Sequence, residues 1–229
     1  MKGVMRSISL VGCAAVLLTL VTVAAVDPAA AAMPRKVWIG GDSMAYQIRP
    51  TLESRLRVAG VVSVPWLCKS SSGLVRTDFL NWPNTARTQM RKYHPKVTVF
   101  MIGTNDGQGM TVKGRVYPFG STGWKKYYRI RVAGVMKSML GNGAQRVYWI
   151  GMPIMASSQF SKTMRVMNSI FRSEADKRPA VTYIDAWKLF SSSSGRYVAK
   201  WRASDGIHFN NAGVDRLVNV VVKKVRSGR

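Results

Sequence analysis

The chain has 229 residues and, with 35 lysines and arginines against 10 aspartates and glutamates, a formal net charge of +25. Only one cysteine, Cys68, follows the apolar amino-terminal segment, which excludes an internal disulfide in the remainder of the chain. That remainder is long enough for one domain with a sizeable core, and it contains no further apolar run that could span a bilayer.

The amino terminus has the pattern of a secretory signal peptide. Lys2 and Arg6 precede an uninterrupted apolar run from Ile8 to Val26, and the small-residue run 29–32 follows. This order predicts a signal peptide over residues 1–32, cleaved after Ala31 or Ala32. The protein is therefore expected to be exported, as a periplasmic, cell-wall-associated or secreted domain of residues 33–229. The apolar run also approaches the ~20 residues that cross a bilayer, so an uncleaved membrane anchor is the alternative.

The charge predicts an affinity for polyanions. Residues 1–32 contain Lys2, Arg6 and Asp27, so their removal lowers the net charge only from +25 to +24. Such a surface attracts anionic polymers at long range, in a salt-dependent manner. For an exported protein we expect these to be anionic envelope polymers, with an anionic membrane surface as another partner. No nucleic acid is expected, because the basic residues are scattered and no nucleic-acid-binding module is present. A role of the charge in solubility alone is the alternative.

Apolar runs and helical periodicity alternate along the chain. Strands are expected at 36–39, 61–67, 97–102, 146–152 and 181–186, and helices at 46–58, 78–93, 124–140, 160–177 and 212–225. Residues 110–123 are predicted to be a glycine-rich excursion and 187–202 a loop. Alternating strands and helices predict an α/β fold, a three-layer αβα sandwich around a parallel sheet of about five strands.

The stretch Gly40-Gly41-Asp42-Ser43-Met44 links the first strand to the first helix. Ser43 is thereby placed at the carboxyl end of a strand, where open α/β sheets bind ligands. The amide groups and the positive dipole end of the following helix favour a substrate that develops negative charge. An ordinary turn with Asp42 or Ser43 as helix cap is the alternative.

Asp205 and His208 lie three residues apart in a turn before the last helix. That spacing allows the carboxylate to hold Nδ1–H of the imidazole, while Nε2 accepts a proton from a serine hydroxyl. The other histidine, His94, precedes Pro95 at the amino end of the third strand and is expected to be a surface residue. A turn or cap role for Asp205, with His208 as a partly buried polar residue, is the alternative.

Two further turns, at Gly73 and Asn105, follow strands at the same edge. Acyl transfer requires donors placed for the oxyanion, and the N–H groups of Ser43 and Gly73 with the Asn105 amide are the candidates. Glycine is expected at 73 because a Cβ would crowd the substrate. A plain turn and an Asx-turn are the respective alternatives.

Together these blocks resemble the SGNH (GDSL-type) hydrolases. The resemblance rests on Gly41-Asp42-Ser43, Gly73, Gly103-Thr104-Asn105-Asp106 and Asp205-Gly206-Ile207-His208, in family order from about Val37 to Val225. It implies the flavodoxin-like SGNH fold, with Ser43 as nucleophile, His208 as base, Asp205 as orienting acid and Gly73 and Asn105 as oxyanion donors. Met44 departs from the leucine of the name-giving motif.

A closer resemblance is to an exported bacterial SGNH branch without an assigned function. It rests on Gly73-Leu74 with Asp78-Phe79 and Trp82-Pro83, on Phe119-Gly120-Ser121 with Trp124, and on the segment 151–155. Trp82, Tyr117 and Trp124 could stack on a sugar, with packing in the core or in a lid as the alternative.

The sequence therefore predicts an exported serine esterase or O-acyltransferase that forms an acyl-serine intermediate, without cofactor or metal. The expected substrate is a small acyl ester on an envelope glycan. A lipid- or thioester-cleaving esterase is one alternative, and it would need a wide apolar cleft. A non-catalytic binder of anionic envelope polymers is the other.

Overall fold

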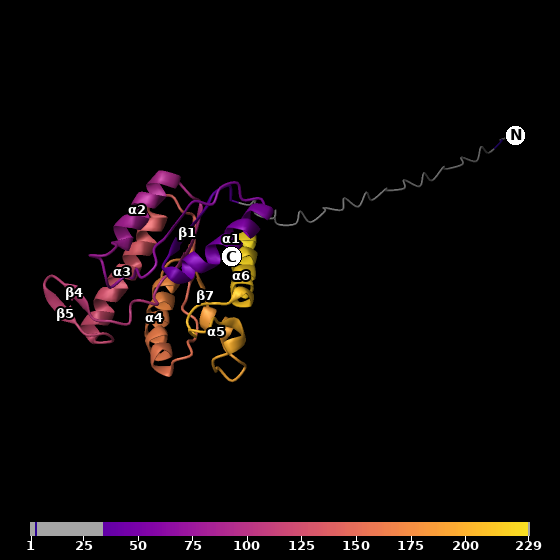
Figure 1. The fold of residues 1–229 in the computed structure, drawn as a ribbon. Helices are drawn as coiled ribbons and strands as arrows, with labels where there is room; N and C mark the ends of the chain where they lie inside the picture. Colours follow the sequence, from indigo (N-terminus) through magenta and orange to yellow (C-terminus); the bar gives the residue numbers. More distant parts are fainter. Residues whose placement is uncertain (1–2, 4–33, 229) are drawn as a thin grey trace. The chain divides into compact units, whose positions relative to one another are not determined.

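The computed structural model describes residue 3 and residues 34–228 (Figure 1). The signal peptide or membrane anchor predicted for residues 1–32 thus lies outside the described residues, Gly3 excepted. Residues 34–228 lie in one compact unit. Among the described helices, none combines the length and the apolar character that crossing a bilayer requires.

The core of this unit is a five-stranded sheet in the order β2-β1-β3-β6-β7. All its pairings are parallel, and its strands are β1 Val37–Gly41, β2 Trp66–Cys68, β3 Val97–Met101, β6 Arg146–Ile150 and β7 Val181–Ile184. Gly41 pairs with Met101, and Met101 pairs with Ile150. The carboxyl ends of the central strands are therefore level, and the turns that follow them share one rim.

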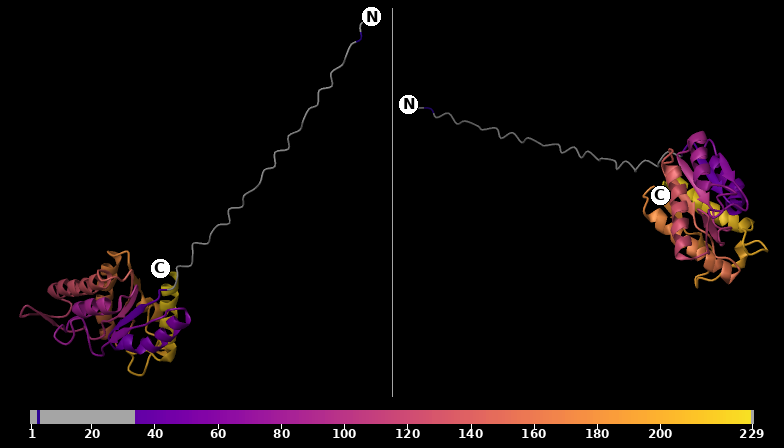
Figure 2. Two further views of the ribbon diagram at one scale, coloured as in Figure 1. Left: turned by 90° about the horizontal axis from the view of Figure 1, so that it is seen from above. Right: turned by 90° about the vertical axis from the view of Figure 1, so that its left-hand side faces the viewer.

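Helices cover both faces of the sheet (Figure 1). On one face α3 (Thr122–Leu140) packs between α2 (Trp82–Tyr93) and α4 (Ser158–Asp176). On the other face α1 (Ser43–Val58) packs against α6 (Asn211–Ser227), and the short α5 (Ala186–Phe190) follows β7. Figure 2 shows the same layers from two further directions. The predicted three-layer α/β sandwich is confirmed.

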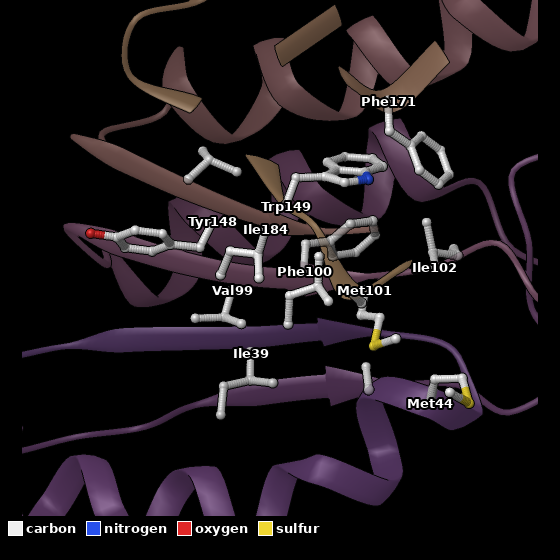
Figure 3. Packing of buried hydrophobic residues seen from close by; sticks show 14 of the residues in the cluster. Ile39, Met44, Val99, Phe100, Met101, Ile102, Tyr148, Trp149, Phe171 and Ile184 are labelled. Carbon is white, nitrogen blue, oxygen red and sulfur yellow. The ribbon is translucent and has the colours of Figure 1, made fainter. Parts of the chain in front are cut away.

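The central strands are buried on both faces, which explains their continuous apolar sequences. Every residue of β1 and β3 is buried. An aromatic cluster lies between the sheet and α2–α4: the Phe100 ring is 5.0 Å from those of Trp82 and Trp149, and Trp149 is 5.2 Å from Phe171 of α4 (Figure 3). Toward the other face, Tyr148 Oη donates to the carbonyl of Lys224 in α6 at 2.8 Å.

Some element boundaries differ from the predicted ones for local reasons. The helix predicted from 78 begins only at Trp82, because the Asn81 side chain caps it by accepting from Asn84 N–H at 3.2 Å. The strand predicted over 61–67 pairs with β1 only at Trp66–Cys68, and Ser63 forms an isolated bridge with Lys36 before it.

Two segments predicted as irregular contain regular structure. The excursion 110–123 holds an antiparallel hairpin, β4 (Met110–Val112) and β5 (Arg115–Tyr117), turned by Lys113 and Gly114 at positive φ. The loop 187–202 contains the end of α5 and a 3₁₀ turn at Ala199–Trp201.

Candidate active site

Ser43 is the first residue of α1, directly after the turn that ends β1. Gly41 has φ +140°, and a Cβ there would lie 1.8 Å from the Met101 carbonyl oxygen, so this turn requires glycine. Asp42 caps α1 by accepting from Met44 N–H at 2.9 Å. The cap role considered in the sequence thus belongs to Asp42, and the hydroxyl of Ser43 remains available for another partner.

That partner is His208, 165 residues further along the chain. The distance between Ser43 Oγ and His208 Nε2 is 3.0 Å, and His208 Nδ1 lies 2.6 Å from Asp205 Oδ2. An ionised carboxylate only accepts hydrogen bonds, so Nδ1 carries a proton and Nε2 accepts from the serine hydroxyl. The structure thus brings together the three residues expected at the site, whereas His94 is exposed and ends α2 in a left-handed conformation.

Asp205 is held in its ionised form. Partial burial disfavours the charge, but the hydrogen bond from the His208 ring and those from Ile207 N–H and His208 N–H outweigh it. Together they lower the pKa of Asp205 from 3.8 to about 2. The two backbone bonds, 2.8 and 2.9 Å long, both end on Oδ1. The other oxygen stays directed at the imidazole, which fixes its tautomer and stabilises the imidazolium.

Two residues that the sequence interpretation missed hold the His208 loop in place. Gln47 lies one helical turn after Ser43, and its amide bonds both backbone groups of Phe209, accepting from the N–H at 2.9 Å. Arg202, 5% exposed, donates to the carbonyls of Ile207 and Ile154. No local pattern marks either residue, because their partners are distant in the chain or are backbone groups.

The predicted oxyanion donors lie at the same rim. Asn105 Nδ2 donates to the Ser72 carbonyl at 2.8 Å, and its second contact, to Thr104 Oγ1 at 3.4 Å, is long enough for a closer acceptor to replace it. Within residues 34–228, no hydrogen-bond acceptor is recorded for the backbone N–H of Ser43 or of Gly73. Backbone N–H groups without an acceptor in the protein can donate to an oxygen that develops negative charge at this rim.

Two buried aspartates tie these turns together. Asp42 accepts from Gly103 N–H, Thr104 N–H and Thr104 Oγ1–H at 3.0, 3.2 and 2.7 Å, joining the turns after β1 and β3. Asp106 accepts from Val75 N–H at 3.0 Å and from Tyr128 Oη–H at 2.7 Å. Burial raises the pKa of both carboxyls, that of Asp106 to about 6.

The position of Asp106 gives a different reason for glycine at 73 from the predicted crowding of the substrate. A Cβ on Gly73 would lie 2.2 Å from Asp106 Oδ1, so the side chain is excluded by the protein itself. The substrate-crowding explanation is not needed. The carboxylate of Asp106, the residue after Asn105, thus packs directly against Gly73.

Two of the three aromatic residues considered for a sugar-stacking platform lie in the core instead. Trp82 and Trp124 are fully buried, and their indole N–H groups are bonded inside the protein, to Ser72 Oγ at 3.1 Å and to the Gln108 carbonyl at 2.9 Å. Tyr117 is partly exposed at the end of β5, and its ring lies 4.9 Å from that of Tyr127. The two tryptophans have the packing role named as the alternative.

Cys68 and the acidic residues give no sign of further chemistry. Burial raises the pKa of the Cys68 thiol to about 12, so the reactive thiolate is suppressed. In the described part of the chain, His, Cys, Asp and Glu side chains form no group of three suited to a metal ion.

Three solved structures with a similar fold have names that refer to ester or acetyl-group chemistry. A GDSL-like lipase from Bacteroides thetaiotaomicron is 13% identical, with a TM-score of 0.63 over 85% of this chain and 89% of that one. A variant of an acetyl xylan esterase from Geobacillus stearothermophilus is 14% identical, with a TM-score of 0.57 over 83% and 94%. The periplasmic domain of a lipopolysaccharide acetyltransferase from Salmonella ser. Paratyphi A is 16% identical, with a TM-score of 0.57 over 83% of each chain.

At these identities the likeness concerns the fold, and it confirms the resemblance to the SGNH (GDSL-type) hydrolases. A comparison with curated proteins gave no match. The family described as "Protein of unknown function (DUF459)" matches residues 36–224, which include every candidate site residue named above. The chain therefore belongs to the DUF459 family and has the fold of the SGNH hydrolases.

Proposed function

We propose that this protein is an exported serine esterase or O-acyltransferase that works through an acyl group on Ser43. The observation that carries the proposal is the hydrogen-bonded series from Ser43 Oγ through the imidazole of His208 to Asp205. A serine hydroxyl is a weak nucleophile without an adjacent base, and this arrangement supplies one together with a group that orients it.

The first half-reaction follows from the geometry. His208 Nε2 takes the proton as Ser43 Oγ attacks the ester carbonyl, and the carbonyl oxygen becomes an oxyanion. The N–H groups of Ser43, Gly73 and Asn105 are the donors proposed to stabilise it. The C–O bond to the leaving alcohol then breaks, and that alcohol takes the proton from Nε2.

In the second half-reaction, His208 Nε2 takes a proton from an acceptor hydroxyl as that oxygen attacks the acyl carbon. The bond between the acyl carbon and Ser43 Oγ then breaks, and Nε2 returns the proton to Oγ. Water as the acceptor gives an esterase, and a sugar hydroxyl gives an acyltransferase. Because both use the same base, the catalytic residues alone do not distinguish them.

For the substrate we propose a small acyl ester, such as acetyl, on an envelope glycan. Three observations support this choice: the predicted export, the net charge of +25, and the names of two proteins with the same fold, an acetyl xylan esterase and a lipopolysaccharide acetyltransferase.

The direct experiment measures hydrolysis of p-nitrophenyl acetate by the wild type and by Ser43→Ala. A loss of about 10³-fold or more is expected, since removal of the nucleophile leaves only binding and oxyanion stabilisation. A fluorophosphonate probe should label the wild type at Ser43 and leave Ser43→Ala unlabelled. Equal rates for the two proteins, with no label on Ser43, would refute the serine mechanism.

Two further measurements refine the proposal. Rates on acetyl, butyryl and octanoyl esters test the acyl length, and a rise with length would favour the lipid-cleaving alternative. Addition of an oligosaccharide acceptor tests transfer: an acyltransferase would form acylated sugar at the expense of free acid.

A further inference from the structure

A groove runs along α4 on the face of the sheet that also carries α2 and α3. It consists of a cavity of about 210 Å³ beside β7 and a second of about 310 Å³ beside α3. Arg165 and Ser169 line both cavities, which makes them neighbouring parts of one groove. We call this the α4 groove, and the side chains that matter here are Lys125, Arg129, Arg165, Ser169, Arg172 and Trp187.

The α4 groove carries uncompensated positive charge. Its single carboxylate, Asp185, is paired with Arg172 at 2.6 Å. Among the described residues, no carboxylate lies within salt-bridge distance of Lys125, Arg129 or Arg165. Since like charges repel, three cations along one groove are stable only with solvent or an anionic ligand between them.

Arg165 is held in an orientation that suits an anion. Its guanidinium carbon lies 4.2 Å from the centre of the Trp187 ring, so the guanidinium covers the indole. Stacking engages the face of the guanidinium and leaves its N–H edge free for a carboxylate or phosphate oxygen. Arg165 is exposed and Trp187 is partly exposed, so a ligand can reach both.

The remaining groups in the groove favour a sugar over a bare polyphosphate or a lipid surface. Ser169 offers a hydroxyl, Asp185 offers a carboxylate that can accept from sugar hydroxyls, and Trp187 offers apolar ring surface. A ligand made only of phosphates would leave the indole face and the Ser169 hydroxyl unused. On one ligand molecule, hydroxyl groups can donate to Asp185 and an acidic group can pair with the basic side chains of the groove.

We propose that the α4 groove binds an acidic saccharide, a sugar chain that carries carboxylate or phosphate groups. The binding itself does not depend on Ser43 acting as a nucleophile. That the saccharide is the same chain whose ester meets Ser43 does rest on the proposed function. Asp185 and Trp187 follow the carboxyl end of β7, which is the edge at which Ser43 lies, and three strand spacings, about 14 Å, separate β7 from β1.

A second basic groove provides a matched control. It lies between α2 and α3, has a volume of about 410 Å³ and contains Arg87, Arg91 and Lys137. It has no aromatic side chain, and Gly141 and Asn142 in its lining precede the amino end of β6. Two arginines can thus be removed from either groove with the same change in net charge.

The experiment measures binding of oligogalacturonate by calorimetry at about 0.15 M salt, where long-range charge effects are screened. The background is full-length Ser43→Ala, so that no turnover occurs. Arg129→Gln/Arg165→Gln should raise the Kd at least about tenfold, and Arg87→Gln/Arg91→Gln should change it less than about threefold. Arg165→Gln alone is the second variant, and circular dichroism checks that each protein is folded.

Further ligands identify the chemistry. Phosphorylated dextran separates a phosphate from a carboxylate requirement, and neutral dextran should bind weakly. Trp187→Leu should weaken oligogalacturonate binding and leave binding of inorganic polyphosphate unchanged.

The inference is overturned if the two arginine pairs weaken binding equally, because net charge would then explain it. It is also overturned if polyphosphate or phosphatidylglycerol vesicles bind as tightly as the saccharide with the same dependence on Arg165. Loss of ester hydrolysis in Ser43→Ala is measured separately, so failure of the groove and failure of the serine mechanism are distinguishable.

Discussion

Two aspartates at the same rim of the sheet have opposite environments. The Asp205 side chain is 45% exposed, and its hydrogen bonds overcome partial burial and lower its pKa to about 2. Asp106 is completely buried, and burial raises its pKa to about 6 despite the donors around it. The comparison shows that the surroundings decide the role: Asp205 is suited to orient a proton-transferring imidazole, and Asp106 is suited to hold backbone turns together.

The site thus has two halves. The relay half consists of Ser43, Asp205 and His208, which meet at the surface through side-chain contacts. The scaffold half consists of the turns around Ser72, Gly73 and Asn105. The buried Asp106 and Asp42 accept hydrogen bonds from backbone N–H groups of these turns. Substitutions in the relay half should affect activity, whereas those of the buried Asp106 and Asp42 should affect stability first. Gly73 belongs to both effects, because its N–H is also a proposed oxyanion donor.

The largest effect is expected for Asp205→Asn. The amide no longer stabilises the imidazolium and favours the wrong tautomer, so kcat on p-nitrophenyl acetate should fall about 10³- to 10⁴-fold. The melting temperature should change little, because the carboxylate is half-exposed. Asp106→Asn is the control, with a loss of about tenfold or less. Similar losses for the two variants would contradict the division into two halves.

The pH dependence of stability tests the buried aspartate. A pKa raised from 3.8 to about 6 means that the folded protein binds the Asp106 proton more tightly than the unfolded chain does. The stability this contributes is fully present below about pH 4 and is lost as the pH rises through about 6, a change of about 3 kcal/mol.

The measurement is the free energy of unfolding, from urea denaturation at pH 4 to pH 7, for the wild type and Asp106→Asn. Asp42, whose pKa is also raised, acts in the same direction in both proteins, so the difference between the two curves isolates Asp106. Parallel curves would show that the Asp106 carboxyl is not more protonated in the folded state than in the unfolded one.

Gly73→Ala tests how the scaffold half positions an oxyanion donor. The new Cβ would lie 2.2 Å from Asp106 Oδ1, so the turn must shift and the Gly73 N–H with it. We expect kcat to fall about 10²-fold, as for the loss of one oxyanion donor. The double variant Gly73→Ala/Asp106→Ala removes the clash, so its loss should be smaller than the product of the two single losses. Multiplicative losses would show that Asp106 does not limit this position.

The relay half could be predicted from the sequence because its information is local. Asp205 and His208 lie within one turn, and Ser43 lies directly between a glycine turn and a helix start. The central strands could be predicted as well, since burial on both faces gives β1 and β3 continuous apolar runs. The edge strand β2 was shorter than predicted, because only three of its residues pair with β1.

The scaffold half could be predicted only in part. Asn105 and Gly73 follow strand ends, but nothing near Gly73 in the sequence indicates that Asp106 fills the space of its Cβ. Gln47 and Phe209 are 162 residues apart, and a single pairing over that distance leaves no periodic signal. The sequence left the role of the two tryptophans open between sugar stacking and packing, because an aromatic residue in a loop or at a helix start has the same sequence pattern whether its ring is buried or exposed.

The smallest effect is expected for Trp82→Phe, which tests that correction. Phenylalanine fills most of the space but cannot donate a hydrogen bond to Ser72 Oγ. The backbone carbonyl of the same serine accepts from the Asn105 amide. We expect the free energy of unfolding to fall by about 1–2 kcal/mol, with KM for acylated oligosaccharides unchanged. Trp66→Phe is the control, because Trp66 is 41% exposed and its replacement should cost less than about 0.5 kcal/mol. A raised KM with unchanged stability in Trp82→Phe would contradict the core role of this ring, because loss of a buried packing and hydrogen-bonding group must lower the stability.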